Sequence, residues 1–347
     1  MNLLFQATAA LLLSFAPPFA GGSPGTGGSP VTGASPADGL KREQLPADVD
    51  FVFHLDVEGL KRTEMWKVFQ ETAGAEMEAE FDELDEFKTQ YGFDPLTDIK
   101  AVTLYKMKSE EDPTVALFCT SAHVDQALLA LSKEAGYARV QDSGIEFHTW
   151  HVAEDEMDET VHAYVHPLPN GERLVVAAKN RASALRAARV LRGEEQNHLA
   201  GGTLLVNPAP GSFLYVSASD VEKLAEFTPA SQVFGLAQGI QVDLGEAGGF
   251  LRAHLSVLTE MPEKARQIAD VVQGLVSLGG LALAGQELEP ALEVLRALRI
   301  NTKGSEVSVD FEFGVRRLVD ILTQLSELDG DESDEADEAD EIEVEAR

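Results

Sequence analysis

The sequence predicts an α+β protein made of an internally duplicated unit, in which antiparallel sheets carry helices packed on one face. Three observations support this prediction. Apolar residues alternate with polar residues in some segments, as in half-buried strands, and recur at three- and four-residue spacing in others, as in amphipathic helices. Successive strands are separated by short polar or glycine-containing turns, which is typical of antiparallel pairing. The same order of elements starts again near residue 212.

The first half is expected to span residues 45–200. Its predicted strands alternate in hydropathy or are short apolar runs, and its predicted helices show helical spacing. The predicted strands are 50–56, 99–107, 113–121, 138–142, 145–152, 160–167 and 172–179. The predicted helices are 57–74, about 75–90, 121–136 and 181–193.

The helix predicted over 121–136 begins at Ser121, a residue type that favours the N-cap position. Leu128, Leu129 and Leu131 are expected on its buried side, and Gly136 is expected at its C-terminal end.

The second half is expected to span residues 201–326. A strand and a helix over 211–227 are followed by a hairpin over 239–258 that turns at Gly248 and Gly249, which suit a tight turn. A long helix over 261–285 comes next. A hairpin and a terminal helix over 295–325 then close the half. This order matches that of the first half and predicts the duplication.

The apolar stretch Val271–Ala284 is too short for the roughly 20 residues that span a bilayer. It continues directly from a charged amphipathic segment. We therefore expect a helix buried between two sheets rather than a membrane helix.

Both ends of the chain differ in composition from the body. An uncharged apolar stretch from Leu3 to Ala16, followed by small residues up to Ala20, predicts a signal peptide over 1–20 and therefore export to the periplasm or the cell exterior. An uncleaved N-terminal anchor is the alternative. Residues 21–44, rich in Gly, Ser and Pro, predict a flexible linker. Residues 327–347 contain 12 acidic residues and one basic residue, which predicts a solvated, disordered acidic tail.

The formal net charge of -32 excludes several classes of partner. Phosphate-bearing polymers and anionic lipid surfaces are bound through patches of Lys and Arg, and the sequence shows no such patch. We therefore expect no nucleic-acid partner and no strong binding to anionic membranes. The single cysteine, Cys119, lies in an apolar run and is expected to be a packed thiol. The sequence contains no GxSxG, HExxH, P-loop, CxxC or GxGxxG motif, which argues against common enzyme classes.

Four of the eight histidines fall in the segment 147–166. If 145–152 and 160–167 pair as a hairpin, His162 and His166 point to one face, whereas His148 and His151 point to opposite faces. A cluster of His148, His162 and His166, with a carboxylate from the acidic hairpin tip 154–156, is the candidate zinc site. Residues four apart on a strand are about 13 Å apart, so one ion reaches both His162 and His166 only if the strand bends. The alternative is a set of ordinary histidines on a sheet surface.

The segments "LPADVDFVFHLDVEGL", "GFDPLTDIKAVTLY" and "GERLVVAAKNRASALRAARVL", with the exported end and linker, resemble exported planctomycete-type proteins of unknown function, similar in style to DUF3352-like proteins. The resemblance covers residues 45–325. It implies export and the duplicated α+β architecture. It implies no activity, because that family has no agreed catalytic residues.

These observations predict an exported, non-enzymatic protein that serves as a binding or scaffold module in the cell envelope, with an unidentified protein or envelope partner and no cofactor. The alternative is a zinc-binding protein or metal-dependent hydrolase that uses the His-rich hairpin 147–166.

Overall fold

The computed structural model describes residues 40–73, 78–108, 114–154, 157–219, 221, 236–283 and 289–325. The predicted signal peptide, most of the predicted linker and the acidic tail lie outside these residues, as do Asp155 and Glu156 of the acidic hairpin tip.

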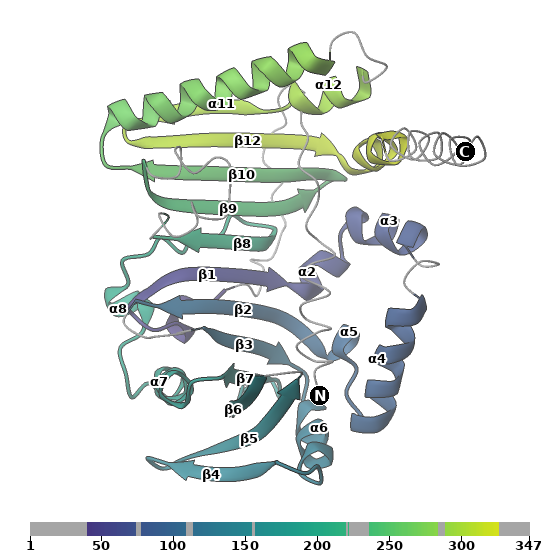
Figure 1. Ribbon diagram of the computed structural model, residues 1–347, viewed down its shortest axis with the longest axis vertical. Helices are drawn as coiled ribbons and strands as arrows, with labels where there is room; N and C mark the ends of the chain where they lie inside the picture. Colours follow the sequence, from purple (N-terminus) through teal and green to yellow (C-terminus); the bar gives the residue numbers. More distant parts are fainter. Residues whose placement is uncertain are drawn as a thin grey trace, which may run out of the picture.

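The described residues form one 12-stranded sheet in the order β11-β12-β10-β9-β8-β1-β2-β3-β7-β6-β5-β4 (Figure 1). Each neighbouring pair is antiparallel. The strands are β1 (Val49–Asp56), β2 (Ile99–Met107), β3 (Val115–Thr120), β4 (Ala138–Asp142), β5 (Ile145–Glu154), β6 (Met157–Pro167), β7 (Arg173–Ala178), β8 (Ser212–Ala218), β9 (Ala237–Ala247), β10 (Phe250–Thr259), β11 (Arg299–Lys303) and β12 (Glu306–Gly314).

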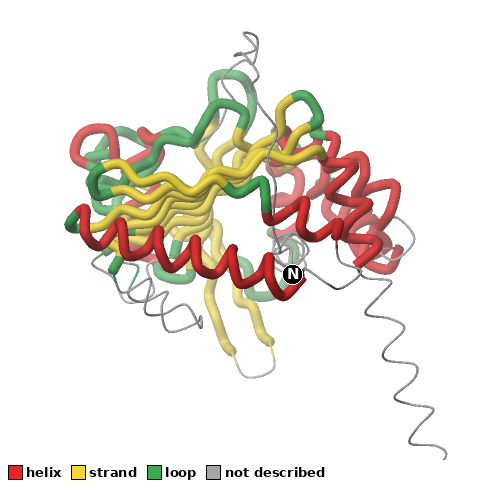
Figure 2. The backbone as a smooth tube through the Cα atoms, turned by 90° about the horizontal axis from the view of Figure 1, so that it is seen from above, coloured by secondary structure: helices red, strands yellow, loops and turns green. Residues whose placement is uncertain are grey.

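Helices are interspersed among the strands along the chain and lie beside the sheet (Figure 2). They are η1 (Arg42–Gln44), α2 (Val57–Lys61), α3 (Glu64–Ala73), α4 (Glu78–Tyr91), α5 (Pro95–Asp98), α6 (Val124–Leu131), α7 (Arg181–Leu191), α8 (His198–Gly201), α11 (Pro262–Leu283) and α12 (Glu289–Leu295). A further helix covers residues 315–325. The α+β class and the antiparallel pairing predicted from the sequence are confirmed.

The sheet has two faces, which we name the α7 face and the α11 face after the helices that pack on them. Ala184, Ala187 and Ala188 of α7 join the core cluster on one face. Ala265 and Ile268 of α11 join a cluster that includes Val257 of β10 and Val307 of β12. The strand register places those two valines on the other face.

The two halves share this single sheet and meet where β1 pairs with β8. Outward from that junction, the first half runs β1-β2-β3-β7-β6-β5-β4 and the second runs β8-β9-β10-β12-β11, so β5 and β4 have no counterpart among the described strands of the second half. The corresponding strands are paired in the same order. The internal duplication itself stays a prediction, because order alone does not establish common origin.

Two predictions about the helices were wrong in detail. Helix α6 begins at Val124, and the Ser121 hydroxyl accepts from the His123 backbone N–H at 3.1 Å instead of capping the helix. Leu129, expected to be buried, is 60% exposed.

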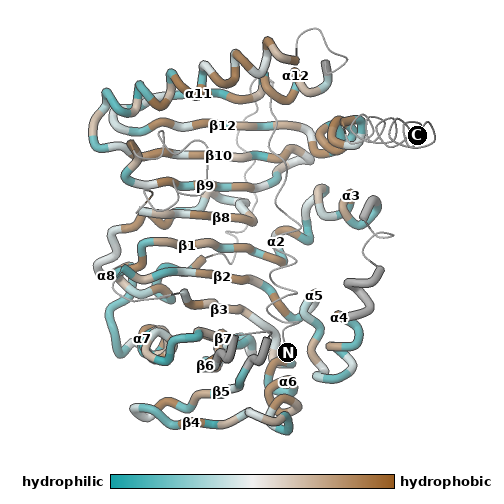
Figure 3. Tube along the Cα trace, in the orientation of Figure 1, coloured by the Kyte–Doolittle hydropathy of each residue, from teal (hydrophilic) through white to brown (hydrophobic). Residues whose placement is uncertain are grey.

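Helix α11 also differs from the expectation of a helix buried between two sheets. Only one sheet is present in the described residues, and α11 packs along it through its N-terminal part (Figure 1). Its later residues Val271, Leu275, Leu278 and Leu281 are exposed. Hydrophobic and hydrophilic residues both occur along α11 (Figure 3). None of the helices in the described ranges combines the length and apolar character needed to cross a membrane.

Candidate functional site

Three strands of the second half alternate between apolar and polar side chains over most of their length. On β9, Gln241 and Asp243 alternate with Val242 and Leu244, and β10 and β12 show the same pattern. Alternate residues of a strand point to the same face of the sheet. The polar sets therefore lie together on the α7 face, whereas the apolar sets lie beneath α11.

One row of directly paired residues on the α7 face runs across nine strands. It is polar from β11 to β2 and apolar from there to β7. In order, it consists of Arg299, Asp310, His254, Asp243, Tyr215, His54, Thr103, Leu117 and Val176. The change from apolar to polar character falls between β3 and β2, so the polar part of the row includes His54 and Thr103 of the first half as well as the strands of the second half.

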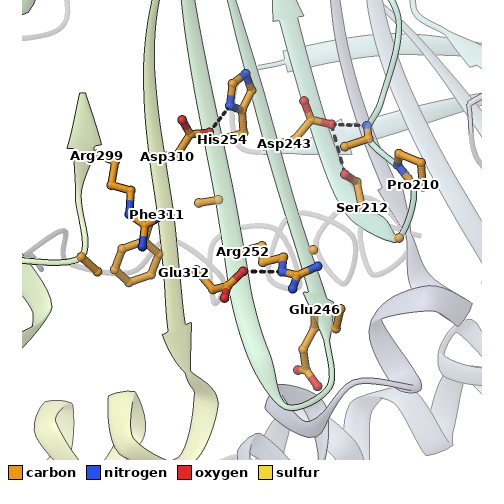
Figure 4. Close-up of a pocket in the computed structure, with 16 residues that line it drawn as sticks. Pro210, Ser212, Asp243, Glu246, Arg252, His254, Arg299, Asp310, Phe311 and Glu312 are labelled. Atoms are coloured by element: carbon orange, nitrogen blue, oxygen red, sulfur yellow. Dashed lines mark hydrogen bonds and ion pairs between the residues drawn. The ribbon is translucent and has the colours of Figure 1, made fainter. Parts of the chain in front are cut away.

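A groove with a volume of about 470 Å³ lies over the polar end of this row (Figure 4). Its charged and histidine side chains are Asp243, Glu246, Arg252, His254, Arg299, Asp310 and Glu312. Residues 209–212, which precede and begin β8, form one wall. The volume suits a small molecule or a few residues of a peptide.

The wall of the groove belongs to a segment, residues 202–211, that crosses the α7 face and is held there by side chains of the sheet. Tyr215, which is fully buried, donates its hydroxyl to the Leu205 carbonyl at 2.7 Å and accepts from the Asn207 N–H at 3.1 Å. Ser217 donates to the same Leu205 carbonyl at 2.7 Å. These bonds fix the crossing segment in place.

Asp243 anchors the end of the crossing segment. Its carboxylate accepts from the Ala209 N–H at 2.8 Å, from the Ser212 hydroxyl at 3.1 Å and from the Gln241 amide at 2.9 Å (Figure 4). Asp243 is 3% exposed. Since three donors satisfy this buried carboxylate, we assign it a positioning role in the groove wall.

Glu246 is also engaged in structure. Its two carboxylate oxygens accept from the Glu64 and Met65 backbone N–H groups, at 2.7 and 2.9 Å, at the start of α3. A carboxylate at a helix N-terminus satisfies donors that otherwise have no partner in the helix. This contact ties α3 of the first half to β9 of the second.

An exposed ion pair and a hydrogen bond between a histidine and a carboxylate line the groove itself. Arg252 Nε lies 2.7 Å from a Glu312 oxygen, and His254 Nδ1 lies 2.7 Å from a carboxylate oxygen of Asp310 (Figure 4). The side chains of Arg252 and Glu312 are 55% and 52% exposed. Exposed pairs contribute little to stability, so a ligand can exchange its own charges for theirs at small cost.

His254 and Asp310 have the geometry of a histidine oriented by a carboxylate, which is the arrangement of a general base. Among the described residues, however, the hydrogen-bond partner of His254 is Asp310, with no hydroxyl or thiol on the other ring nitrogen. A complete relay of nucleophile, base and carboxylate is therefore not assembled around His254 in the described residues.

His54 lies in the same row beyond Tyr215 and is 4% exposed. Its Nδ1 is 2.8 Å from the Thr103 hydroxyl. Burial lowers the pKa of His54 to about 4, so its ring is neutral at neutral pH. This histidine belongs to the core at the centre of the sheet.

The predicted histidine hairpin forms, as β5 and β6, and the predicted faces are confirmed. His148 is paired with Ala163, and His162 with Thr149, so His148 lies on the α11 face while His162 lies on the α7 face. His166 shares the α7 face with His162, because it is four residues further along β6. The three histidines of the candidate zinc site therefore do not converge in this structure.

Two of these histidines have a tyrosine hydroxyl beside the imidazole ring. The Tyr137 hydroxyl lies 2.6 Å from His148 Nδ1, and the Tyr164 hydroxyl lies 3.2 Å from His166 Nδ1. Burial lowers the pKa of His148, His162 and His166. Within the described residues, no group of three or more His, Cys, Asp or Glu side chains is placed to hold a metal ion. The zinc site stays a prediction.

A second polar cluster lies where β2 and β3 meet α5 and α6. One oxygen of Asp98 accepts from the Ser121 hydroxyl at 2.6 Å and lies 2.8 Å from His123 Nδ1. Burial tends to raise the pKa of Asp98, but hydrogen bonds from Ser121, the Asp94 backbone and His123 outweigh it and lower the pKa. Both side chains bind the carboxylate, so Ser121 is not aligned for activation by His123.

Cys119 behaves as predicted. Burial, followed by the nearby Glu172 carboxylate, raises the pKa of its thiol to about 12, so the reactive thiolate form is suppressed.

Comparisons with known proteins find a partial structural similarity to a solved protein. No protein-family model matches the sequence, and no curated protein matches it significantly. Solved structures of TP0453 in crystal forms IV, III and I match with TM-scores of 0.42, 0.41 and 0.41 and sequence identities of 13%, 12% and 15%. The matches cover 84%, 85% and 85% of this chain and 97%, 100% and 98% of TP0453.

Proposed function

We propose that this chain is an exported, non-catalytic binding protein of the cell envelope, and that the groove over β9, β10 and β12 holds its ligand. The observation that carries the proposal is the groove itself, a hollow of about 470 Å³ on the polar α7 face of the second half. Export is supported by the apolar N-terminal segment and the Gly, Ser and Pro-rich stretch after it.

The charges in the groove indicate the kind of ligand. Arg252 offers a cation for a carboxylate, and Glu312 and Asp310 offer anions for an ammonium group. Because the acidic and basic groups alternate within one small groove, they favour a ligand that carries both charges. A free amino acid or a short peptide meets this requirement.

Thermal unfolding of the full chain in the presence of free amino acids and dipeptides tests the proposal. A ligand that binds only the folded state raises the unfolding temperature, and a concentration of 100 times Kd stabilises by about 2.7 kcal/mol. The double variant Arg252→Gln, Glu312→Gln is expected to lose this shift. Ser308→Ala, on the same face outside the groove, is the matched control and is expected to retain it. The absence of any shift across the panel would count against the ligand site.

The non-catalytic part of the proposal has its own test. Peptide, ester and phosphate-ester substrates incubated with the full chain are expected to show no turnover. Turnover that disappears in His254→Ala but persists in His148→Ala would contradict the non-catalytic proposal. It would indicate a hydrolase whose active site contains His254 and Asp310.

Metal analysis of the purified full chain, with the His148→Ala, His162→Ala variant beside it, tests the zinc alternative. Stoichiometric zinc that is lost in this variant would require the hairpin strands to bend together.

A further inference from the structure

Among the described residues, β11 is the last strand of the sheet on the side of the second half. An edge strand presents unpaired backbone N–H and C=O groups along its open side and can accept another strand. Arg299, Asn301 and Lys303 are exposed and lie on the α7 face, whereas Ile300 and Thr302 lie on the α11 face. The edge therefore has one basic side and one less polar side.

The basic character of this edge is local. The stretch from Arg296 to Lys303 contains three basic residues and no acidic residue, in a chain whose formal net charge is -32. An acidic segment with a strand-like alternation is the complementary partner, since backbone pairing supplies affinity and alternate side chains supply specificity.

The C-terminal sequence contains such a segment. Residues 341–345 read Glu-Ile-Glu-Val-Glu, so the acidic residues Glu341, Glu343 and Glu345 alternate with Ile342 and Val344. This differs from the preceding "DESDEADEAD", which lacks β-branched residues. On a strand, the three glutamates share one face and the two branched residues share the other.

The anchor point of the C-terminal segment lies near the start of β11. Ile321 and Leu325 of the helix 315–325 pack with Val294 and Ala297, and Ala297 is two residues before Arg299. The 15 residues 326–340 reach up to about 50 Å when extended, several times the length of a five-residue strand. The connection is therefore long enough for either strand direction.

We infer that Glu341–Glu345 adds to the edge of β11 as a further strand of the same sheet. Antiparallel pairing, as in the rest of the sheet, places Glu341 opposite Lys303, Glu343 opposite Asn301 and Glu345 opposite Arg299. Ile342 and Val344 then lie beside Thr302 and Ile300 on the face where α11 packs. Opposite charges across strands and continuous apolar contacts both favour this register.

Disulfide trapping in the full chain tests the pairing. Asn301→Cys with Glu343→Cys places two thiols directly opposite each other, at a separation compatible with a disulfide. Asn301→Cys with Glu335→Cys is the control, with a shorter tether and therefore no lower effective concentration. The first pair is expected to give about tenfold more intrachain disulfide under mild oxidation. Equal yields, or a disulfide found only between two chains, would overturn the inference.

Hydrogen exchange separates strand addition from loose charge attraction. If the segment is docked about nine-tenths of the time, the outward-facing amides of β11 exchange about tenfold more slowly than in a chain ending at Ser333. Ile342→Pro with Val344→Pro is expected to remove the protection, because proline cannot donate to a strand and the charge is unchanged. Ala336→Pro with Ala339→Pro is expected to keep it. If the β11 amides stay protected in the variant Ile342→Pro with Val344→Pro, the segment is held by charge attraction and not as a strand. That result would also overturn the inference.

Discussion

The α7 face of the sheet has opposite character in the two halves of the molecule. In the first half, β3, β7 and α7 enclose an apolar core that includes Leu117, Val176 and Ala187. In the second half, the same face carries Asp243, His254 and Asp310, and the helix packed on β10, β11 and β12 in the described residues lies on the opposite face. The same sheet therefore encloses an apolar core in one half and presents a polar surface in the other.

The largest contrast is expected when a charge is introduced on each half of this face. Ala187 is 1% exposed against the first half, so Ala187→Asp buries a carboxylate without a partner and is expected to destabilise the fold by about 4 kcal/mol or more. Ser308→Asp, on the polar half of the same face, is expected to cost about 1 kcal/mol or less. Urea unfolding of both variants measures the two values. Similar losses would show that the second half is packed as tightly as the first.

His54 is buried at the junction between the two halves, and its lowered pKa should make the stability of the fold depend on pH. The pKa of His54 is about 4 in the folded protein and 6.5 in the reference state, so the unfolded chain binds a proton that the folded chain does not between these values. Stability therefore falls as the pH drops from 6.5 to 4, by about 3 kcal/mol from this group.

The variant His54→Asn isolates that contribution. An asparagine amide can replace the Nδ1 contact with Thr103 but does not titrate in this range. Urea unfolding at several pH values is expected to show a shallower fall for the variant than for the wild type. His148, His162, His166 and His198 also have a lowered pKa and remain in both proteins, so the difference between the curves is the relevant quantity. Parallel curves would contradict the prediction.

The crossing segment that forms the groove wall should be sensitive to Tyr215. Tyr215→Phe removes a donor to Leu205 and an acceptor for Asn207 in a buried position, and is expected to cost about 2 kcal/mol. Ser217→Ala removes one bond to the same Leu205 carbonyl and is expected to cost about 1 kcal/mol. Chemical denaturation measures both losses. A ligand that still binds to Ser217→Ala but not to Tyr215→Phe would show that the wall, and not only the sheet, shapes the groove.

Much of this fold could be predicted from local patterns in the sequence. The hairpin of β5 and β6 followed from alternation, and the division of His148 from His162 followed from strand geometry alone. The burial of Leu129 was predicted wrongly because leucine at helical spacing indicates an apolar side without showing where a helix turns away from the core. A single sheet instead of two could not be foreseen, since it depends on β1 pairing with β8 across more than 150 residues of chain.

The groove could not be predicted from the sequence either, because it too depends on how distant strands pair. The sequence does show polar residues alternating with apolar ones, which marks one polar face on each of three strands. The polar residues are Asp243, Arg252, His254, Asp310 and Glu312. What the sequence does not state is the register that aligns those faces into one surface. The clustered histidines were conspicuous because they are close in sequence, whereas the groove is assembled from strands that are paired in space.

The smallest expected effect concerns the exposed pair of Arg252 and Glu312 in the groove. A double-mutant cycle with Arg252→Gln and Glu312→Gln is expected to give a coupling of about 0.2–1 kcal/mol, which is the range for exposed ion pairs. The coupling should decrease in 1 M salt, where the Debye length is about 3 Å. A coupling well above this range that resists salt would mean that the groove shields its charges from water. The second half would then resemble the first more closely than the exposed fractions of these side chains indicate, and a ligand would have to displace a strong pair instead of a weak one.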